Sequence, residues 1–291
     1  MNYIMEETRF KILKLIVVFL LCSHCLLLFA TKEGIVEVVA KEYGVFIGLN
    51  GKDIEEDKGS LLPYKILVLE PEECSKEKLD VFINNKQQVF AYLNIGSLET
   101  YRTYYKRYKK FLRASYKDWP DEYWVDVSQK EWQDFITRKL APKYKDLGFH
   151  GFFIDNIDVY YHYPTKEIYK GLIAILTELK KSELTIIING GDVFVSKLID
   201  EGVKLELFDG VNQECVFTRI DFKKDAYGVQ GVEEHQYLDA YLQKVKRHGK
   251  MVFLLEYGSS KKLAKKIANY CKKEGFLYFI SQDKTLRKDM L

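Results

Sequence analysis

Eight short runs of apolar residues recur along the chain, and their spacing constrains the fold more than any other feature. A strand with one face in water alternates apolar and polar side chains, whereas these runs are almost continuously apolar. Such runs are typical of parallel strands that are buried on both faces. They occupy residues 45–49, 65–70, 89–96, 151–156, 185–190, 210–215, 251–258 and 277–281.

Stretches with the spacing of an amphipathic helix lie between several of the runs. Residues 235–249 and 260–275 have this spacing, and each ends in a glycine suited to a helix C-terminus. Eight strands that alternate with helices predict an α/β protein, a single (β/α)8 TIM barrel, with a doubly wound open sheet as the alternative. The clearest helical stretch, residues 166–181, places five apolar side chains on one face: Ile168, Leu172, Ile175, Leu176 and Leu179.

The chain length of 291 residues suits one such barrel, because this domain typically has ~250 residues. No linker rich in Pro, Ser or Gly interrupts the series of runs. Residues 97–149, between the third and fourth runs, are too many for one helix. We therefore expect this segment to form a long loop over the barrel mouth.

The N-terminus carries three basic residues followed by an apolar run at residues 15–30. This is the order of a secretory signal, and the run is shorter than the ~20 residues of a full membrane span. We expect residues 1–30 to be a cleaved signal peptide or an uncleaved anchor held in a membrane through residues 15–30, with a buried helix as the alternative. Residues 31–291 then form the barrel, extracellular or at the cell surface.

Cysteine and histidine spacing argues against a metal or disulfide framework. Cys74, Cys215 and Cys271 form no CxxC pair, and the five histidines are scattered without an HExxH pattern. Residues 53–59, "DIEEDKG", loosely match a calcium loop, but the glycine is misplaced and the closing glutamate is absent. We therefore expect neither a metal nor a cofactor.

The charge balance gives no indication of a nucleic-acid partner, since the formal net charge is only +3. Residues 102–113, "RTYYKRYKKFLR", interleave basic residues with tyrosines, as an anionic-polymer surface can. We interpret this stretch as an amphipathic helix whose basic side chains lie along its exposed face.

Acids, amides and one tyrosine lie at or just beyond the ends of most of the apolar runs. In a TIM barrel the active site lies at the carboxyl ends of the strands, so these residues would form the rim of the site. A rim of carboxylates and carboxamides favours a polyol or a cationic ligand over a phosphate. The residues are Asn50, Glu70, Asn94, Glu99, Asp155, Asn156, Asp158, Asn189, Asp192, Asn212, Glu214, Glu256 and Tyr257.

Two of these acids suit glycoside hydrolysis, which needs two carboxyl groups on either side of one bond. One group protonates the leaving oxygen, and the other attacks the anomeric carbon or activates water. Asp155 lies at the end of the fourth run and Glu214 near the end of the sixth, so both would face the same gap at the barrel mouth. They are the candidate catalytic pair, with Asp158 and Glu256 in reserve.

Structural roles are the alternative for the same acids. Asp155 or Asp158 could cap the helix that follows its strand. Glu214 could instead be the partner of a buried arginine, either Arg102 or Arg219.

Six segments, taken together and in order over residues 42–283, resemble glycoside hydrolase family 114, the endo-α-1,4-polygalactosaminidase-like TIM-barrel proteins. They are "YKILVLEPEECSKEKL", "VFAYLNIGSLETYR", "YWVDVSQKEWQDFI", "GFHGFFIDNIDVY", "IIINGG" and "GVNQECVF". The resemblance implies that Asp155 in "FFIDNID" and Glu214 in "NQEC" are the catalytic pair. Similar barrels that cleave α-glycosides make Asp155 the nucleophile and Glu214 the acid/base, although the roles could be exchanged.

The resemblance also implies a substrate, an α-1,4-linked galactosamine polymer that is partly deacetylated and therefore cationic. Two turns depart from the family pattern and leave the sugar open: Glu70-Pro71 replaces Asp-Pro, and Ser97-Leu98-Glu99 replaces a small acidic turn.

We thus predict an exported glycoside hydrolase that acts on an amino-sugar polysaccharide. A cell-surface carbohydrate-binding protein with little or no turnover is the first alternative, and a hydrolase for a different glycan is the second. Asn94 and Asn189 could equally be satisfied amides of the core. The predicted sugar-binding residues are Asp158, Asn94, Asn156, Asn189, Asn212, Glu256 and Tyr257.

Overall fold

The computed structural model describes residues 27–31, 34–38, 41–202 and 204–290, and the chain divides into two compact units, residues 1–40 and 41–291. In the first unit, β1 (Leu27–Thr31) and β2 (Gly34–Val38) pair antiparallel. Most of the predicted signal or anchor segment, residues 1–30, lies outside the described residues, which begin at Leu27. Among the described helices, none is long and apolar enough to cross a membrane.

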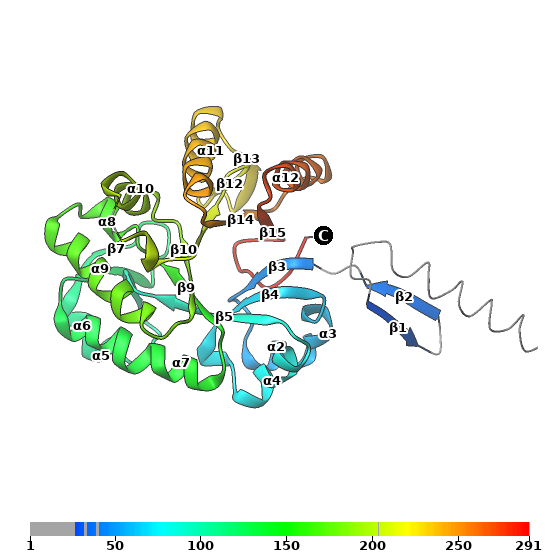
Figure 1. Cartoon of the computed structure of the whole chain (residues 1–291), viewed down its shortest axis with the longest axis horizontal. Helices are drawn as coiled ribbons and strands as arrows, with labels where there is room; N and C mark the ends of the chain where they lie inside the picture. The colour runs from blue at the N-terminus through cyan, green and yellow to red at the C-terminus, as the bar shows by residue number, and fades with distance from the viewer. Residues whose placement is uncertain (1–26, 32–33, 39–40, 203, 291) are drawn as a thin grey trace, which may run out of the picture. The chain divides into compact units, whose positions relative to one another are not determined.

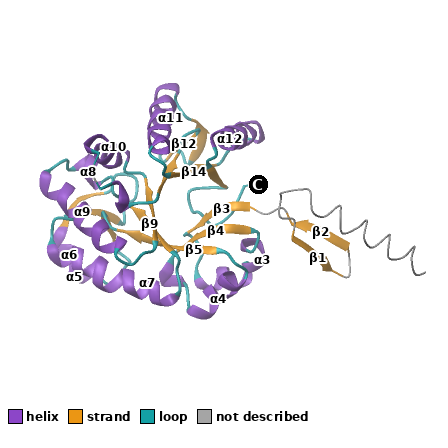
Figure 2. Ribbon diagram, viewed as in Figure 1, coloured by secondary structure: helices purple, strands orange, loops and turns teal. Residues whose placement is uncertain are grey.

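The second unit is built around one sheet of eight parallel strands (Figures 1 and 2). The two outermost strands of the sheet, β15 and β3, lie beside each other and nearly close it into a barrel. The predicted (β/α)8 TIM barrel is therefore confirmed. In sheet order the strands are β3 (Lys41–Phe46), β4 (Tyr64–Leu69), β5 (Gln88–Asn94), β9 (Gly151–Asp155), β10 (Thr185–Asn189), β11 (Gly210–Glu214), β14 (Met251–Tyr257) and β15 (Leu277–Ser281).

Seven of the eight strands lie where the apolar runs predict them, and the first does not. The run at 45–49 predicted that strand one ends at Asn50, whereas β3 ends at Phe46. Asn50 instead begins the next helix, where its side chain accepts hydrogen bonds from the backbone of Lys52 and Asp53. The apolar run continues past the strand because Leu49 is also buried, so apolar content alone does not mark the strand end.

Helices surround the sheet, as Figure 1 shows. The three predicted helices are confirmed as α9, α11 and α12, and Gly275 ends α12 in the left-handed conformation. The α-helices are α2 (Gly51–Glu56), α3 (Lys58–Leu61), α4 (Lys76–Asn84), α5 (Tyr105–Tyr108), α6 (Lys130–Phe135), α7 (Ala141–Leu147), α8 (Val159–His162), α9 (Lys166–Lys180), α10 (Asp192–Glu201), α11 (Val232–Arg247) and α12 (Lys261–Glu274). The described residues also form the 3-10 turns η1 (Pro71–Glu73), η2 (Lys109–Phe111) and η4 (Leu205–Leu207), and the π-helical stretch η3 (Ile136–Leu140).

The segment at 97–149 contains its own small sheet, so it is more than a loop. β6 (Ser97–Glu99), β8 (Glu122–Val125) and β7 (Leu112–Ser115) pair antiparallel in that order. The amphipathic helix predicted for residues 102–113 is wrong, because only the short helix α5 and the 3-10 turn η2 form before the chain enters β7. Backbone pairing with β8 replaces helical hydrogen bonds there.

A β-hairpin follows β11 and is formed by β12 (Thr218–Asp221) and β13 (Ala226–Val229).

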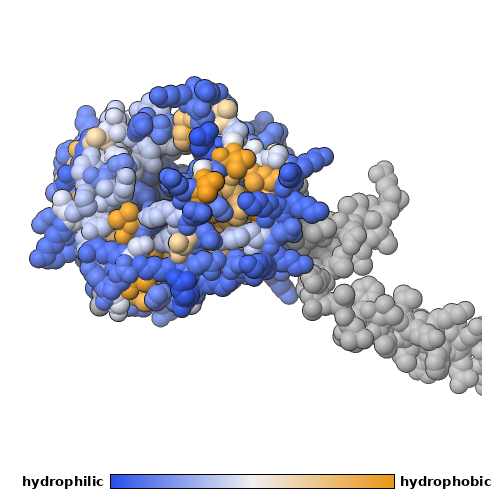
Figure 3. All heavy atoms as spheres, turned by 90° about the horizontal axis from the view of Figure 1, so that it is seen from above, coloured by the Kyte–Doolittle hydropathy of each residue, from blue (hydrophilic) through white to orange (hydrophobic). Residues whose placement is uncertain are grey.

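Inside the barrel, the rings of Tyr43 and Phe253 pack with centroids 4.8 Å apart. Figure 3 views the described residues from the side that is uppermost in Figure 1, where hydrophilic residues dominate and hydrophobic ones form small groups.

Candidate active site

Asp155 and Glu214 come together at the carboxyl ends of their strands, on either side of Asn189. The amide nitrogen of Asn189 donates hydrogen bonds of 2.8 Å to Asp155 Oδ1 and 2.7 Å to Glu214 Oε1. The strand order explains the meeting, because β10 runs between β9 and β11 and ends at Asn189. The sequence-predicted pair therefore shares one donor.

A chain of hydrogen bonds sets the orientation of Asn189. The Tyr43 hydroxyl donates to Asn212 Oδ1 at 3.0 Å, so the nitrogen of Asn212 is turned away from Tyr43. That nitrogen donates to Asn189 Oδ1 at 2.6 Å. With its oxygen occupied, Asn189 presents its nitrogen to the two carboxylates. Asn189 and Asn212 are buried. Their amide groups hydrogen-bond to each other, and Asn189 also bonds to the two carboxylates, so these amides do more than satisfy each other in the core.

A tyrosine hydroxyl contacts each member of the pair. Tyr92 donates to Asp155 Oδ2 at 2.8 Å, and Tyr257 donates to Glu214 Oε2 at 2.6 Å. Burial raises the pKa of Asp155, and the hydrogen bonds from Asn189 and Tyr92 oppose that rise. Burial and the Asp155 charge both raise the pKa of Glu214. Hydrogen bonds from Tyr257 and Asn189 oppose the rise at Glu214, so both carboxyl groups keep pKa values above their ordinary ones, with burial as the main cause.

A third carboxyl group, Glu122 on β8, reaches this site and was missed by the sequence reasoning. Its Oε1 accepts hydrogen bonds from Asn156 at 2.9 Å, from Asn94 at 3.2 Å and from the Ser97 hydroxyl. Burial raises the pKa of Glu122 to about 7, aided by the charges of Glu99 and Asp155. Glu122 follows no apolar run of the barrel, so reading strand ends could not find it.

The pKa of Tyr116, a residue that the sequence reasoning also missed, is affected by the same carboxyl groups. Burial raises its pKa first. The charges of four acids raise it further: Asp155, Asp158, Glu122 and Glu214. Because Tyr116 lies between β7 and β8, the segment at 97–149 supplies two groups to the barrel mouth.

Asp158 contacts the start of α10, one strand away along the sheet. Both of its carboxylate oxygens lie 3.1 Å from the backbone nitrogen of Gly191. It forms no capping hydrogen bond to α8, the helix that follows it. Gly190 and Gly191 both have positive φ, so the turn before α10 suits glycine. Burial and the charges of Asp192 and Asp155 raise the pKa of Asp158 to about 7.

Glu256 lies outside this cluster, although Tyr257 next to it lies inside. Successive strand residues point to opposite faces, and Tyr257 takes the face that carries Glu214. Glu256 accepts hydrogen bonds from the backbone nitrogens of Phe217 and Thr218, at 2.9 and 2.8 Å. It therefore holds the entry to β12 in place and does not reach Asp155 or Glu214.

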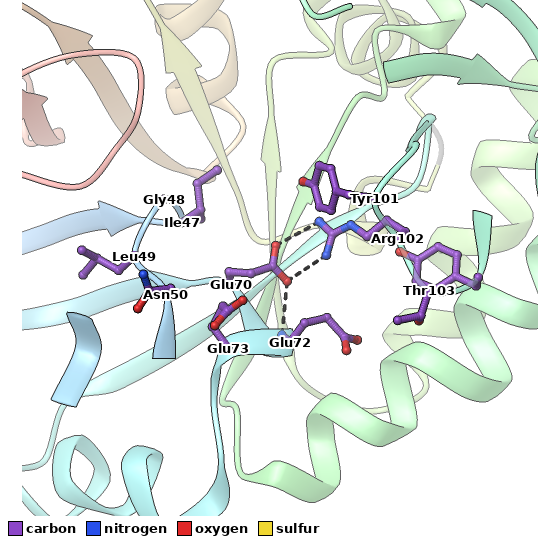
Figure 4. Close-up of a pocket in the computed structure, with 11 residues that line it drawn as sticks. Ile47, Gly48, Leu49, Asn50, Glu70, Glu72, Glu73, Tyr101, Arg102 and Thr103 are labelled. Carbon is purple, nitrogen blue, oxygen red and sulfur yellow. Dashed lines mark hydrogen bonds and ion pairs between the residues drawn. The ribbon is translucent and has the colours of Figure 1, made fainter. Parts of the chain in front are cut away.

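A pocket of about 310 Å³ is lined by residues from 47–50, 70–73 and 101–104, and neither Asp155 nor Glu214 is among its lining residues (Figure 4). Arg102 points to Glu70 in this view and donates to its two oxygens at 3.0 and 2.9 Å, and to Glu99 at 3.0 Å. Burial disfavours the Arg102 cation, but these two acids raise its pKa overall. Arg102 is therefore not the partner of Glu214, which excludes one alternative role for that acid.

The chemistry of the site depends on carboxyl, amide and phenol groups. Within the described ranges, no group of three or more His, Cys, Asp or Glu side chains is arranged to hold a metal ion. Two carboxyl groups that share one donor can act together as a nucleophile and a proton donor when one is ionised and the other is protonated.

Comparison with solved structures finds the same fold in carbohydrate-active proteins. The glycoside hydrolase domain of PelA from Pseudomonas aeruginosa has a TM-score of 0.69 at 16% identity, covering 86% of this chain and 96% of that one. Ega3 of Aspergillus fumigatus, solved in complex with galactosamine, has a TM-score of 0.63 at 15% identity, covering 85% and 93%. The α-galactosidase TtGalA of Thermus thermophilus has a TM-score of 0.54 at 9% identity, covering 82% and 57%.

Sequence comparison gives one partial relative and one family. An uncharacterized protein of Thermotoga maritima is 28% identical over 101 residues, and that match spans 33% of this chain and about a third of the relative, 31%. The family model of glycoside-hydrolase family GH114 matches residues 46–290, which is nearly the whole barrel. The chain therefore belongs to glycoside-hydrolase family GH114.

Proposed function

We propose that the protein hydrolyses an α-1,4-linked galactosamine polysaccharide at or outside the cell surface, with Asp155 as nucleophile and Glu214 as acid/base. The observation that carries the proposal is the shared donor, Asn189. Its two hydrogen bonds, of 2.8 and 2.7 Å, limit the bonded carboxylate oxygens to a separation of at most about 5.5 Å. Retaining glycosidases hold their carboxyl groups ~5–5.5 Å apart, whereas inverting ones need ~6.5–9.5 Å.

The reaction follows from this spacing in two steps. An oxygen of Asp155 forms a bond to the anomeric carbon while the glycosidic bond breaks, and the Glu214 proton moves to the leaving oxygen. Glu214, now ionised, then takes a proton from water. That water attacks the anomeric carbon and releases Asp155, so the product keeps the α configuration.

Support for an amino-sugar substrate comes from the charge of the mouth and from a neighbour. The charges of four carboxyl groups raise the pKa of Tyr116, and a cationic polymer would be attracted to these groups. Ega3, which shares the fold, was solved with galactosamine. Export is proposed from the basic and apolar order of residues 1–30.

The test is a cleavage assay with the purified full-length chain and a partly deacetylated α-1,4-galactosamine polymer. Mass spectrometry is expected to detect short oligomers with the wild type, and NMR to detect the α anomer first. Asp155→Asn and Glu214→Gln are expected to lower kcat by roughly 10²–10⁴-fold. Glu131→Gln, on an exposed glutamate of α6, is the control and should cleave like the wild type.

Two results would contradict the proposal in different ways. Saturable polymer binding without fragments would make the chain a binding protein. Fragments from Asp155→Asn or Glu214→Gln at the wild-type rate would remove these residues from catalysis.

A further inference from the structure

Glu122 has one carboxylate oxygen fully engaged and the other free. Oε1 accepts three hydrogen bonds, from Ser97, Asn94 and Asn156. Oε2 accepts none from the described residues, and it is not among the buried atoms that lack a partner. The three donors fix the direction of the carboxylate, so the accessible oxygen is held in place before any ligand arrives.

Glu122 also lies close to the candidate nucleophile. Asn156 Nδ2 lies 2.9 Å from Glu122 Oε1 and 3.4 Å from Asp155 Oδ2. The amide of Asn189 thus bridges Asp155 to Glu214, and the amide of Asn156 bridges Asp155 to Glu122.

The charge of Glu122 is uncompensated within the described part of the chain. Glu70 and Glu99, which lie nearby, are paired with Arg102 at 2.9 and 3.0 Å. No Lys or Arg side chain of the described residues forms an ion pair with Glu122 or with Asp155. An exposed oxygen on a fixed, unpaired carboxylate suits a cationic group of the ligand.

Sugar geometry identifies which group that is. The carbon attacked by Asp155 is bonded directly to C2, and in galactosamine C2 carries the amino group. Hydrogen bonds to the C2 substituent strengthen in the transition state of glycosidases. Building on the function proposed above, we propose that Glu122 binds the 2-ammonium group of the sugar at the cleaved bond and so selects a free amine over an N-acetyl group.

The main test compares substrates with wild type and Glu122→Gln. The variant keeps an oxygen for the three donors but replaces the accessible oxygen with an NH₂ group. Its kcat/KM for the deacetylated polymer is expected to fall by roughly 10–100-fold, with little change for a fully N-acetylated polymer. Glu131→Gln is again the matched control. Equal losses on both polymers would overturn the proposal.

Ligand binding tests the role of Glu122 without any measurement of hydrolysis. Calorimetry of galactosamine, galactose and N-acetylgalactosamine should give the tightest binding for galactosamine with wild type, and no such preference with Glu122→Gln. Were the wild type to cleave no polymer yet show this preference, the hydrolase proposal would fail and the Glu122 proposal would stand. Equal binding of the three sugars by the wild type overturns the Glu122 proposal, even if the variant does not fold.

Discussion

Asn212 donates a 2.6 Å hydrogen bond to the amide oxygen of Asn189, and this contact decides which end of Asn189 faces the catalytic pair. Without this hydrogen bond, the amide of Asn189 could turn and present its oxygen to the two carboxyl groups. Asn189 would then accept hydrogen bonds from Asp155 and Glu214 and would no longer donate to them.

Replacing Asn212 with leucine tests this relationship. Asn212→Leu is expected to lower kcat/KM by about 10–100-fold, because the variant loses the bond that orients Asn189. Steady-state hydrolysis of the polymer measures the change, with thermal melting to verify folding. Tyr43→Phe removes only the hydroxyl behind Asn212 and should have a smaller effect. A folded Asn212→Leu with wild-type rates would show that Asn189 needs no such orientation.

The pH dependence of stability should report on Asp158, whose pKa is raised from 3.8 to about 7. The folded state binds this proton more tightly than the unfolded state, so the stabilisation is full below pH 3.8 and is lost as pH rises through about 7. Asp158→Asn removes the titration but keeps an oxygen for the Gly191 N–H. Between about pH 5 and about pH 8, the unfolding free energy of the wild type should fall. That of the variant should fall by roughly 1–3 kcal/mol less.

Urea unfolding at the two pH values measures this difference. Asp134→Asn is the control, because Lys130 lowers the pKa of that exposed acid and it stays ionised throughout this range. If wild type and Asp158→Asn lose stability in parallel, Asp158 does not titrate there.

Arg102 should contribute strongly to stability, since it neutralises two buried acids, Glu70 and Glu99. Arg102→Leu would leave both carboxylates buried without a cation, at a cost of about 3–5 kcal/mol. Arg138→Leu, which breaks an exposed pair with Asp134, should cost less than about 1 kcal/mol. Chemical denaturation of both variants measures the contrast, and similar losses would mean that the Arg102 group is effectively solvated.

Much of the barrel could be predicted because its strands are buried on both faces. Three strands end where the sequence predicts, at Asp155, Asn189 and Glu214. The order of the apolar runs therefore predicted that these residues lie close together. The same signal placed the first strand end at Asn50, because the buried loop after β3 is as apolar as the strand.

The rest of the site depends on information that apolar runs do not contain. Glu256 and Tyr257 are adjacent, and only the register of β14 against β11 decides that the tyrosine faces Glu214. Glu122 arrives on an antiparallel strand of the segment at 97–149, whose pairing with β6 brings it beside Ser97 and Asn156. Tertiary pairing, and not local pattern, places it there.

The chain just after β5 lies very close to the chain just after β9, at Gly96 and Asn156. A Cβ atom on Gly96 would lie 1.7 Å from the backbone oxygen of Asn156, so only glycine fits between the two strand ends. Gly96→Ala must push Asn156 away, and Asn156 connects Asp155 to Glu122. We expect this variant to lose about 1–3 kcal/mol of unfolding free energy.

The variant should also lose activity at temperatures where it is still folded, because the carboxyl groups shift. Gly59→Ala is the matched control, since a Cβ there meets no atom within 4 Å and alanine favours the helix α3. Urea unfolding and polymer hydrolysis, measured on both variants, separate the two effects. A Gly96→Ala variant as stable and active as Gly59→Ala would mean that the strand ends can separate without disturbing the site.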